Sequence, residues 1–270
     1  LVASYGEGGQ IELWPLDGGR SEARAFNQGP ATHSCSDFRF DPSGEFLTAC
    51  YDSGKALVWD IRGPPGAEPI TLDVGGTRTP QAGFHPGGRL LATATFPASV
   101  ELWPFEPRRY PSVLRGHTGE IEQLAFDPGG RFLLSNSTDG TIRHWPLGHA
   151  AAELPRVLYS WGHPVEAVVG WMALSDDGRF VVATGNETSA RLISLDAGTV
   201  RSVGDFDQRL LRAAVDAGGQ QLAFHATRRG VRVLQTMALG SGERTDVELP
   251  SPELFDDSIG RSPVAGVGVG

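Results

Sequence analysis

The sequence predicts an all-β fold assembled from about six copies of one antiparallel unit. Three observations support this prediction. Short runs alternate polar and apolar residues, as residues 120–126 do. Tight-turn residues join these runs, as at 127–130 and 138–140. The same order of runs and turns returns along the whole chain, and each copy ends on a tryptophan or an aliphatic residue. Short strands joined by tight turns form antiparallel hairpins.

The spacing of the copies narrows the fold further. The residues that end each copy are separated by 45, 44, 42, 48 and 41 residues. A period near 44 residues suits a four-stranded propeller blade and is too long for most other repeats. The residues compared are Trp14, Trp59, Trp103, Trp145, Ile193 and Leu234.

The best-formed copy runs from 113 to 147 and contains three predicted strands, at 120–126, 132–137 and 141–145. The first copy has only its second half, because the chain starts at Leu1 inside a repeat. We predict outer strands at 21–26, 69–72 and 245–249. The predicted repeats lie at about 1–28, 29–73, 74–112, 113–156, 157–204 and 205–250, with a closing strand at about 262–270.

The copy at 113–147 resembles the WD40 repeats, because GlyHis at 116–117, AspGly at 139–140 and a final tryptophan have that family's spacing. Pro146 stands where the family usually has aspartate. The resemblance implies a WD40-like β-propeller of four-stranded antiparallel blades. It also implies a buried structural tetrad of hydrogen-bonded residues, namely His117, Ser135, Asp139 and Trp145. A buried carboxylate and imidazole must be paired, so such a chain fixes one geometry.

Propellers of this family usually close by completing one blade from both ends of the chain, which removes exposed sheet edges. The segment 262–270 would then supply the strand that the first copy lacks. This gives a single propeller of six blades over 1–270, or seven if the chain is truncated, and we expect a fragment of a longer protein.

Composition argues against several partners. The chain has 23 Lys and Arg against 32 Asp and Glu, for a net charge of −9, and no basic stripe, so we expect no nucleic acid partner. No run of 18 apolar residues occurs, so we expect no membrane partner. Lys55 is the only lysine, a bias that we associate with a GC-rich bacterial genome, and we expect a cytoplasmic protein.

Cys35 and Cys50 are the only cysteines, so the chain is not a disulfide scaffold. If residues 41–44 close a hairpin, residue 40 pairs with 45 and Cys35 lies opposite Cys50. A disulfide between them is then an open alternative.

We find no catalytic, cofactor or metal signature. His144 and His149 lie on a strand and its exit loop, and the HExxH, CxxC, EF-hand and GxSxG patterns are absent. We therefore predict no cofactor, no metal and no enzymatic activity. A propeller hydrolase that uses carboxylates of the central channel is the less favoured alternative.

We expect a non-catalytic scaffold that binds a protein or peptide, which is what the resemblance implies. In such propellers the loops between second and third strands, and those that enter the first strand, carry the binding face. Aromatic and arginine residues commonly anchor interfaces. The candidates here are Phe96, Tyr159, Trp161, Glu187, Arg228 and Arg229. The main alternative is the regulatory or sensor region of a larger bacterial signalling protein, a protein kinase or NTPase, with other domains of the same polypeptide as partners.

Overall fold

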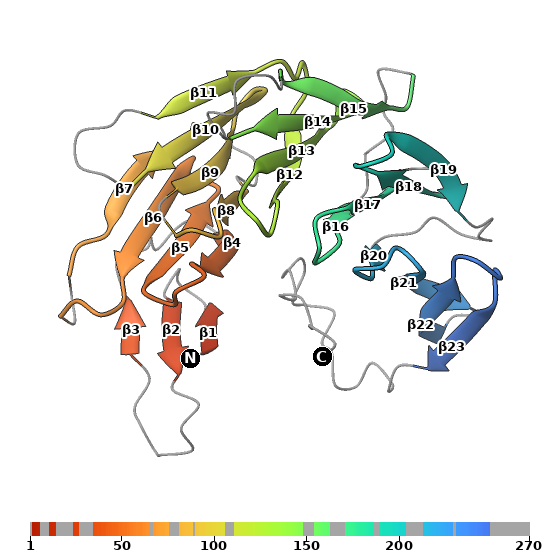
Figure 1. The fold of residues 1–270 in the computed structure, drawn as a ribbon. Coiled ribbons are helices and arrows are strands. Elements are labelled where there is room, and N and C mark those ends of the chain that lie inside the picture. The colour runs from red at the N-terminus through yellow and green to blue at the C-terminus, as the bar shows by residue number, and fades with distance from the viewer. Residues whose placement is uncertain are drawn as a thin grey trace. The chain divides into compact units, whose positions relative to one another are not determined.

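The computed structural model describes residues 2–5, 11–14, 24–26, 35–64, 67–75, 81–88, 90–105, 111–147, 154–162, 171–185, 189–203, 213–228 and 231–248. Every regular element in these ranges is a β-strand, drawn as an arrow in Figure 1. The predicted all-β class is confirmed.

The strands form six sheets, and each sheet is an antiparallel meander of strands consecutive in sequence. The first sheet has three described strands, β1 (Val2–Tyr5), β2 (Ile11–Trp14) and β3 (Arg24–Phe26). Five sheets have four strands, as expected of WD40-like blades. The second sheet contains β4 (Cys35–Phe40), β5 (Phe46–Tyr51), β6 (Lys55–Asp60) and β7 (Ile70–Asp73). The third contains β8 (Ala82–Phe84), β9 (Leu90–Thr95), β10 (Ser99–Pro104) and β11 (Ser112–Arg115).

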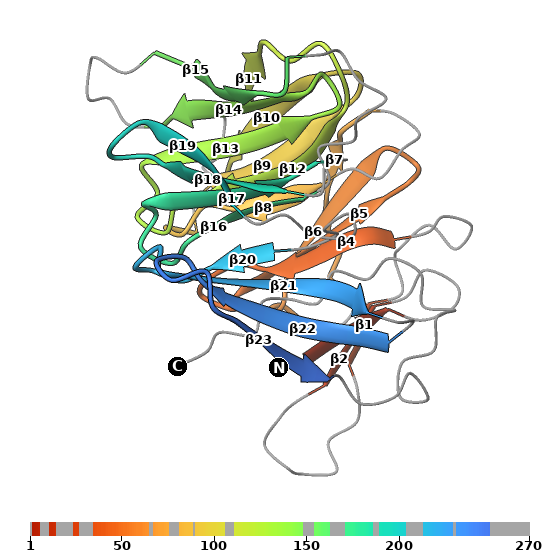
Figure 2. The ribbon, with the colours of Figure 1, turned by 90° about the vertical axis from the view of Figure 1, so that its right-hand side faces the viewer.

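The remaining three sheets follow the same order. The fourth contains β12 (Ile121–Phe126), β13 (Phe132–Ser137), β14 (Thr141–Pro146) and β15 (Arg156–Ser160). The fifth contains β16 (Trp171–Leu174), β17 (Phe180–Thr184), β18 (Ala190–Ser194) and β19 (Thr199–Val203). The sixth contains β20 (Ala213–Val215), β21 (Gln221–Arg228), β22 (Val231–Ala238) and β23 (Arg244–Glu248), which Figure 2 shows side by side.

The described residues divide into two compact units, one that ends at Gly116 and one that begins at His117. The first unit holds the first three sheets and the second holds the last three. That the two units together form one closed propeller remains a prediction.

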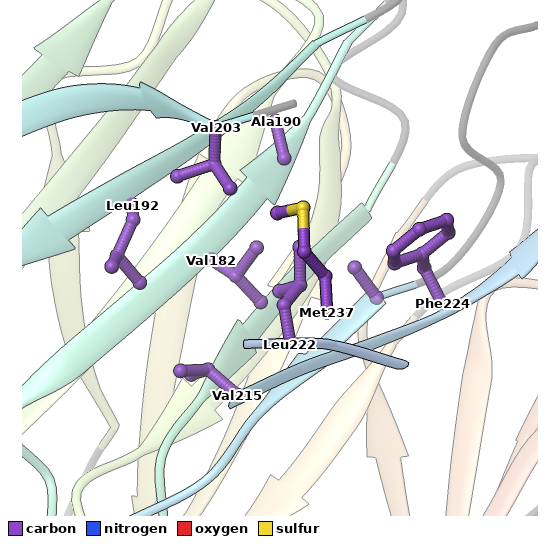
Figure 3. Close-up of a cluster of buried hydrophobic side chains, with 9 residues drawn as sticks. Val182, Ala190, Leu192, Val203, Val215, Leu222, Phe224 and Met237 are labelled. Atoms are coloured by element: carbon purple, nitrogen blue, oxygen red, sulfur yellow. The ribbon is translucent and has the colours of Figure 1, made fainter. Parts of the chain in front are cut away.

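Alternation along the central strands buries both faces of a sheet. On β5, Leu47, Ala49 and Tyr51 pack against Ile11 and Leu13 of the first sheet. The intervening Cys50 packs on the opposite side, in a cluster with residues of the third sheet. In the second unit, one cluster joins the fourth and fifth sheets and another, shown in Figure 3, joins the fifth and sixth. Strands with two buried faces read as nearly continuous apolar runs, as Phe180–Thr184 of β17 does.

One turn recurs between the first and second strands of five sheets. In each, the first residue of the turn donates its N–H to a carbonyl five residues later and accepts an N–H from a glycine three residues later. These glycines have φ between +62° and +70°, a region that side chains disfavour. The first residues are Asp41, His85, Asp127, Ser175 and Asp216. Both Asp41 and Asp216 also accept two backbone N–H groups through one carboxylate oxygen, at 2.7 Å each, from the first residue of the following strand and the residue before it.

Most strands lie within one to three residues of their predicted positions. Trp14 lies on β2, and the residues that end the second to sixth copies lie on the third strands of their sheets. Trp59, Trp145 and Ile193 are buried there. One boundary between predicted repeats differs. Ser112–Arg115 pairs with β10 and is the outer strand of the third sheet, although most of it lies in the predicted fourth repeat at 113–156. The predicted closing strand at 262–270 lies outside the described residues.

The predicted register of the cysteines was wrong. Phe40 pairs with Leu47, not residue 45, and a β-bulge between Cys35 and Asp37 places Cys35 opposite Tyr51. Cys35 packs on the side of the sheet that faces the first sheet, whereas Cys50 packs toward the third. No disulfide joins them. Burial raises the pKa of the Cys35 thiol to about 12, and burial also raises that of Cys50. Both thiols are therefore protonated and poorly reactive at neutral pH.

Candidate functional site

Four side chains of the fourth sheet form a continuous hydrogen-bonded chain. Trp145 Nε1 donates to Ser135 Oγ at 2.8 Å, and Ser135 Oγ lies 2.7 Å from His117 Nε2. On the other side of the ring, His117 Nδ1 lies 2.9 Å from Asp139 Oδ2. These are the four residues of the structural tetrad that the resemblance to WD40 repeats implies. Ser135 sits at the centre of β13, Trp145 on β14 and Asp139 on the turn between these strands.

The chemistry of the donor groups determines which atom donates and which accepts in each of these hydrogen bonds. The indole N–H can only donate, so the Ser135 hydroxyl accepts from Trp145 and donates its own proton to His117 Nε2. The neutral imidazole then carries its proton on Nδ1 and donates it to the carboxylate of Asp139. Both ring nitrogens are occupied, and His117 is only 7% exposed. The ring therefore has no nitrogen available to act as a base or a metal ligand.

The pKa values of the pair agree with this assignment. Burial lowers the pKa of His117, and this effect exceeds the opposing influence of Asp139, so the imidazole is neutral at pH 7. Burial acts to raise the pKa of Asp139. Hydrogen bonds from the Thr141 hydroxyl, the Thr118 N–H and His117 outweigh it and leave the Asp139 pKa below its ordinary value.

Asp139 also joins the entry loop to the turn. Its Oδ2 accepts the N–H of Thr118 at 2.9 Å, and its Oδ1 accepts the N–H and the hydroxyl of Thr141 at 2.9 and 2.6 Å. Gly119 lies so close to Thr138 that a Cβ would come within 2.5 Å of the Thr138 hydroxyl oxygen. The tetrad thus holds the loop that enters β12 against the β13–β14 turn.

Other sheets keep only part of this arrangement. In the third sheet, Trp103 Nε1 donates to Thr93 Oγ1 at 2.9 Å, which reproduces the tryptophan-to-hydroxyl step. Pro97 and Gly75 stand near the positions of the aspartate and histidine. In the second sheet, Ala49 occupies the position of Ser135.

The candidate contact residues differ in their surroundings. Phe96, in the turn between β9 and β10, is 55% exposed. Tyr159 and Trp161 are partly buried, and their rings meet edge to face with centroids 4.6 Å apart. Glu187 and Arg229 lie outside the described residues, and of Arg228 only the backbone, at the end of β21, is described.

The sequence did not indicate the residues that hold the rings of Tyr159 and Trp161 in place. Arg191 Nε donates to the Tyr159 hydroxyl at 2.8 Å, and its Nη1 donates to Ser189 and Ser202. A Cβ at Gly185 would come within 3.0 Å of Trp161 Nε1, so a glycine lets the ring lie against the end of β17. Both rings pack on the cluster between the fourth and fifth sheets. These contacts join different sheets, so no spacing within one repeat indicates them.

Two oxygen-bearing side chains that sequence analysis passed over link neighbouring sheets. Gln123 Oε1 accepts the N–H of Met172 at 2.6 Å, and Asp37 Oδ2 accepts the N–H of Ala82 at 3.4 Å. Each follows a β-bulge in the first strand of its sheet, between Ile121 and Gln123 or between Cys35 and Asp37. The bulge turns the side chain toward the first strand of the next sheet.

No group of three or more His, Cys, Asp or Glu residues in the described part of the chain is arranged to hold a metal ion. The described ranges also contain no helix with the length and hydropathy needed to cross a membrane.

Comparison with known proteins agrees with the repeat architecture. The family model for the WD40 repeat (WD domain, G-beta repeat) matches residues 26–60 and 108–146. The second match contains all four residues of the hydrogen-bonded chain. No curated protein matched the sequence. Proteins built from WD40 repeats are in general non-catalytic scaffolds for protein interaction. Two segments of this chain therefore match the WD40 repeat, and five of its sheets have the four antiparallel strands of a WD40-like blade.

Proposed function

We propose that this chain is a scaffold that binds an extended peptide or a protein loop through the turns between second and third strands and the loops that enter first strands. The exposure of Phe96 carries the proposal. Phe96, at the tip of a hairpin, is 55% exposed, so more than half of its surface is open to a partner. Aromatic side chains in such positions are frequent anchors of interfaces.

The hydrogen-bonded chain of the fourth sheet supports the proposal from a second direction. A binding loop keeps its affinity when it is held in one conformation, because less entropy is then lost on association. Asp139 holds the entry loop at Thr118 and the turn at Thr141, so these two segments form one rigid element. Tyr159 and Trp161 are likewise held, by Arg191 and by the end of β17.

A selection of peptides from a display library on the full chain tests the proposal. We expect selected peptides to bind the Phe96→Ser variant at least roughly tenfold more weakly than the wild type, as for an aromatic anchor. Ile70→Ser is the matched control, because Ile70 is 52% exposed on the outer strand β7 of the same unit. Trp161 suits this test less well, since its ring also packs on the core.

Equal affinities of wild type, Phe96→Ser and Ile70→Ser for every selected peptide would contradict the proposal. A partner that proves to be a kinase or NTPase domain encoded in the same polypeptide would assign the scaffold to the regulation of a larger bacterial signalling protein. A cytoplasmic location belongs to that same proposal.

A further inference from the structure

A pocket of about 320 Å³ lies between the fifth and sixth sheets of the second unit. Its base is formed by Phe180, Leu192 and Gly219, and its rim by four polar side chains. These are Ser194, Thr199, Arg201 and Gln220. The volume is near the lower end of the range for pockets that bind small ligands, which suits one side-chain-sized group.

Strand register explains why these residues meet. Phe180, Ser194 and Thr199 lie opposite one another across β17, β18 and β19, and Leu192 lies opposite Arg201. All five therefore project from the side of the fifth sheet that packs on the sixth. Figure 3 shows Leu192 at the side of the shared cluster that lies away from Phe224. The pocket occupies the space beyond this edge.

The turn that starts the sixth sheet forms the opposite wall. Gly219 lies so close to the Phe180 ring that a Cβ would come within 2.6 Å of it. This contact seals the base, while Gln220 next to it is exposed at the rim.

The charge of the rim is positive although the chain as a whole carries −9. Arg201 is exposed and forms no ion pair with an acidic side chain of the described residues. Among the described residues, two acidic side chains of the adjoining turns already accept other hydrogen bonds. Asp196 accepts Arg179 Nε at 2.6 Å, and Asp216 Oδ1 accepts the N–H groups of Gln220 and Gln221. Ser194 Oγ accepts the N–H of Ala197, which leaves its hydroxyl proton for a ligand.

We propose that this pocket binds a carboxylate carried on an apolar group. Arg201 and the Ser194 and Thr199 hydroxyls would donate to the carboxylate, and Phe180 and Leu192 would cover the apolar part. Charge-assisted hydrogen bonds from a guanidinium are among the stronger polar contacts that such a ligand can make. A free organic acid and the C-terminal residue of a peptide share this chemistry.

Methyl NMR on the full chain tests the proposal with N-acetyl-leucine as the probe and N-acetyl-leucine amide as its neutral match. We expect the acid to shift the Leu192 methyl signals in a saturable way and the amide to leave them unchanged. A short peptide that ends in leucine with a free carboxylate, compared with its amidated form, provides the second arm. Tighter binding of the peptide than of N-acetyl-leucine assigns the pocket to a peptide C-terminus, and equal binding assigns it to a small acid.

The variants separate this pocket from the rest of the surface. Arg201→Met should weaken binding of the acid by roughly tenfold or more, through loss of the charged donor. Arg156→Met, an exposed arginine on the outer strand β15 of the fourth sheet, is the matched control and should bind like the wild type. Thr199→Trp, which fills the pocket from an exposed strand position, should abolish binding. The proposal is overturned if neither acid shifts Leu192, if the amide binds equally, or if Arg201→Met binds like the wild type.

The outcome is independent of the peptide-binding proposal. Phe180 begins β17 and Gly185, which contacts Trp161, follows its last residue, so the pocket and Trp161 lie at opposite ends of this strand. Phe96→Ser should leave binding of N-acetyl-leucine unchanged.

Discussion

At the scale of single residues, the hydrogen bonds of the tetrad offset the cost of burying polar groups and hold its four side chains in one geometry. A carboxylate and an imidazole in the interior cost free energy unless every donor and acceptor is used. Here Asp139 accepts four hydrogen bonds, and both nitrogens of His117 are engaged. Removing one member leaves its partners buried and unsatisfied, which costs more than the bond itself contributes.

The Asp139→Asn variant tests this account with almost no change in shape. In the variant an NH2 group replaces one of the two carboxylate oxygens. At least one N–H or O–H group that donates to that oxygen in the wild type would then face another donor. We expect a loss of about 2 to 4 kcal/mol in the free energy of unfolding, measured by urea denaturation.

Asp196→Asn is the control for that measurement. Asp196 also binds a basic side chain, at 2.6 Å, but both partners are more than half exposed. Exposed pairs are worth less than about 1 kcal/mol. If the two variants unfold at the same urea concentration, the tetrad has no special structural role.

The stability of the fold should depend on pH through His117. Its folded-state pKa lies below the ordinary value of 6.5, so the unfolded chain takes up a proton before the folded chain does. The stability contributed by the neutral ring is complete above pH 6.5 and is lost as the pH falls toward the folded-state pKa. Asp139, with a pKa below 3.8, adds a second loss at still lower pH.

Urea denaturation at about pH 7.5 and about pH 5.5 measures the first loss. We expect wild-type stability to fall more between these conditions than that of His117→Gln, which cannot titrate. The change in stability with pH must be compared between the two proteins, because the chain has seven histidines and the others also titrate. An equal change in both proteins would show that His117 has an ordinary pKa in the folded state.

The members of the tetrad could be predicted from the resemblance to WD40 repeats, because all four residues lie within one repeat and match that family's positions. The contacts that hold the Trp161 ring could not be predicted. They involve Gly185 and the core between two sheets, and packing between sheets leaves no periodic pattern in the sequence. Sequence therefore named Trp161 as a contact residue without indicating that its ring is partly committed to the core.

At the scale of elements, strands were easier to predict than registers. Alternation and turn residues placed β12, β13 and β14 to within one residue of their observed ends. The pairing of β4 with β5 escaped prediction because a bulge adds one residue and the connection is longer than four residues. Both the bulge at Cys35 and that at Ile121 direct a polar side chain to the next sheet, so their cause lies outside the hairpin.

The turn that starts the sixth sheet allows a direct test of element packing. Gly219→Ala combines an unfavourable φ of +62° with a collision against the Phe180 ring. We expect a loss of about 2 to 4 kcal/mol in the free energy of unfolding, since the turn must move away from the fifth sheet.

Gly198→Ala separates the two causes. Gly198 also has φ of +62°, but nothing lies within 4 Å of its added Cβ. This variant should lose only the conformational part, about 1 kcal/mol. Equal losses in the two variants would show that contact between the turn and Phe180 does not contribute to stability.

At the scale of the whole molecule, the sequence repeat allows the number of sheets to be predicted but does not show whether they close into a ring. Each sheet packs on its neighbours in sequence within its unit, so the period of the sequence indicates the number of sheets. Closure is a different property, because it depends on a contact between the two ends of the repeat array. The first sheet has three described strands, and β1 is one of its edges.

We predict from the sequence that residues 262–270 complete this first sheet by pairing with β1. A variant in which these residues are replaced by a Gly/Ser segment of equal length should lose several kcal/mol in the free energy of unfolding, through loss of strand pairing and burial. It should also aggregate faster, because an uncovered strand edge templates pairing between chains. Thermal unfolding followed by circular dichroism and by light scattering measures both effects. Because the replacement keeps the length, a wild-type midpoint and wild-type scattering would mean that this segment closes no sheet, and the six-bladed closure would have to be abandoned.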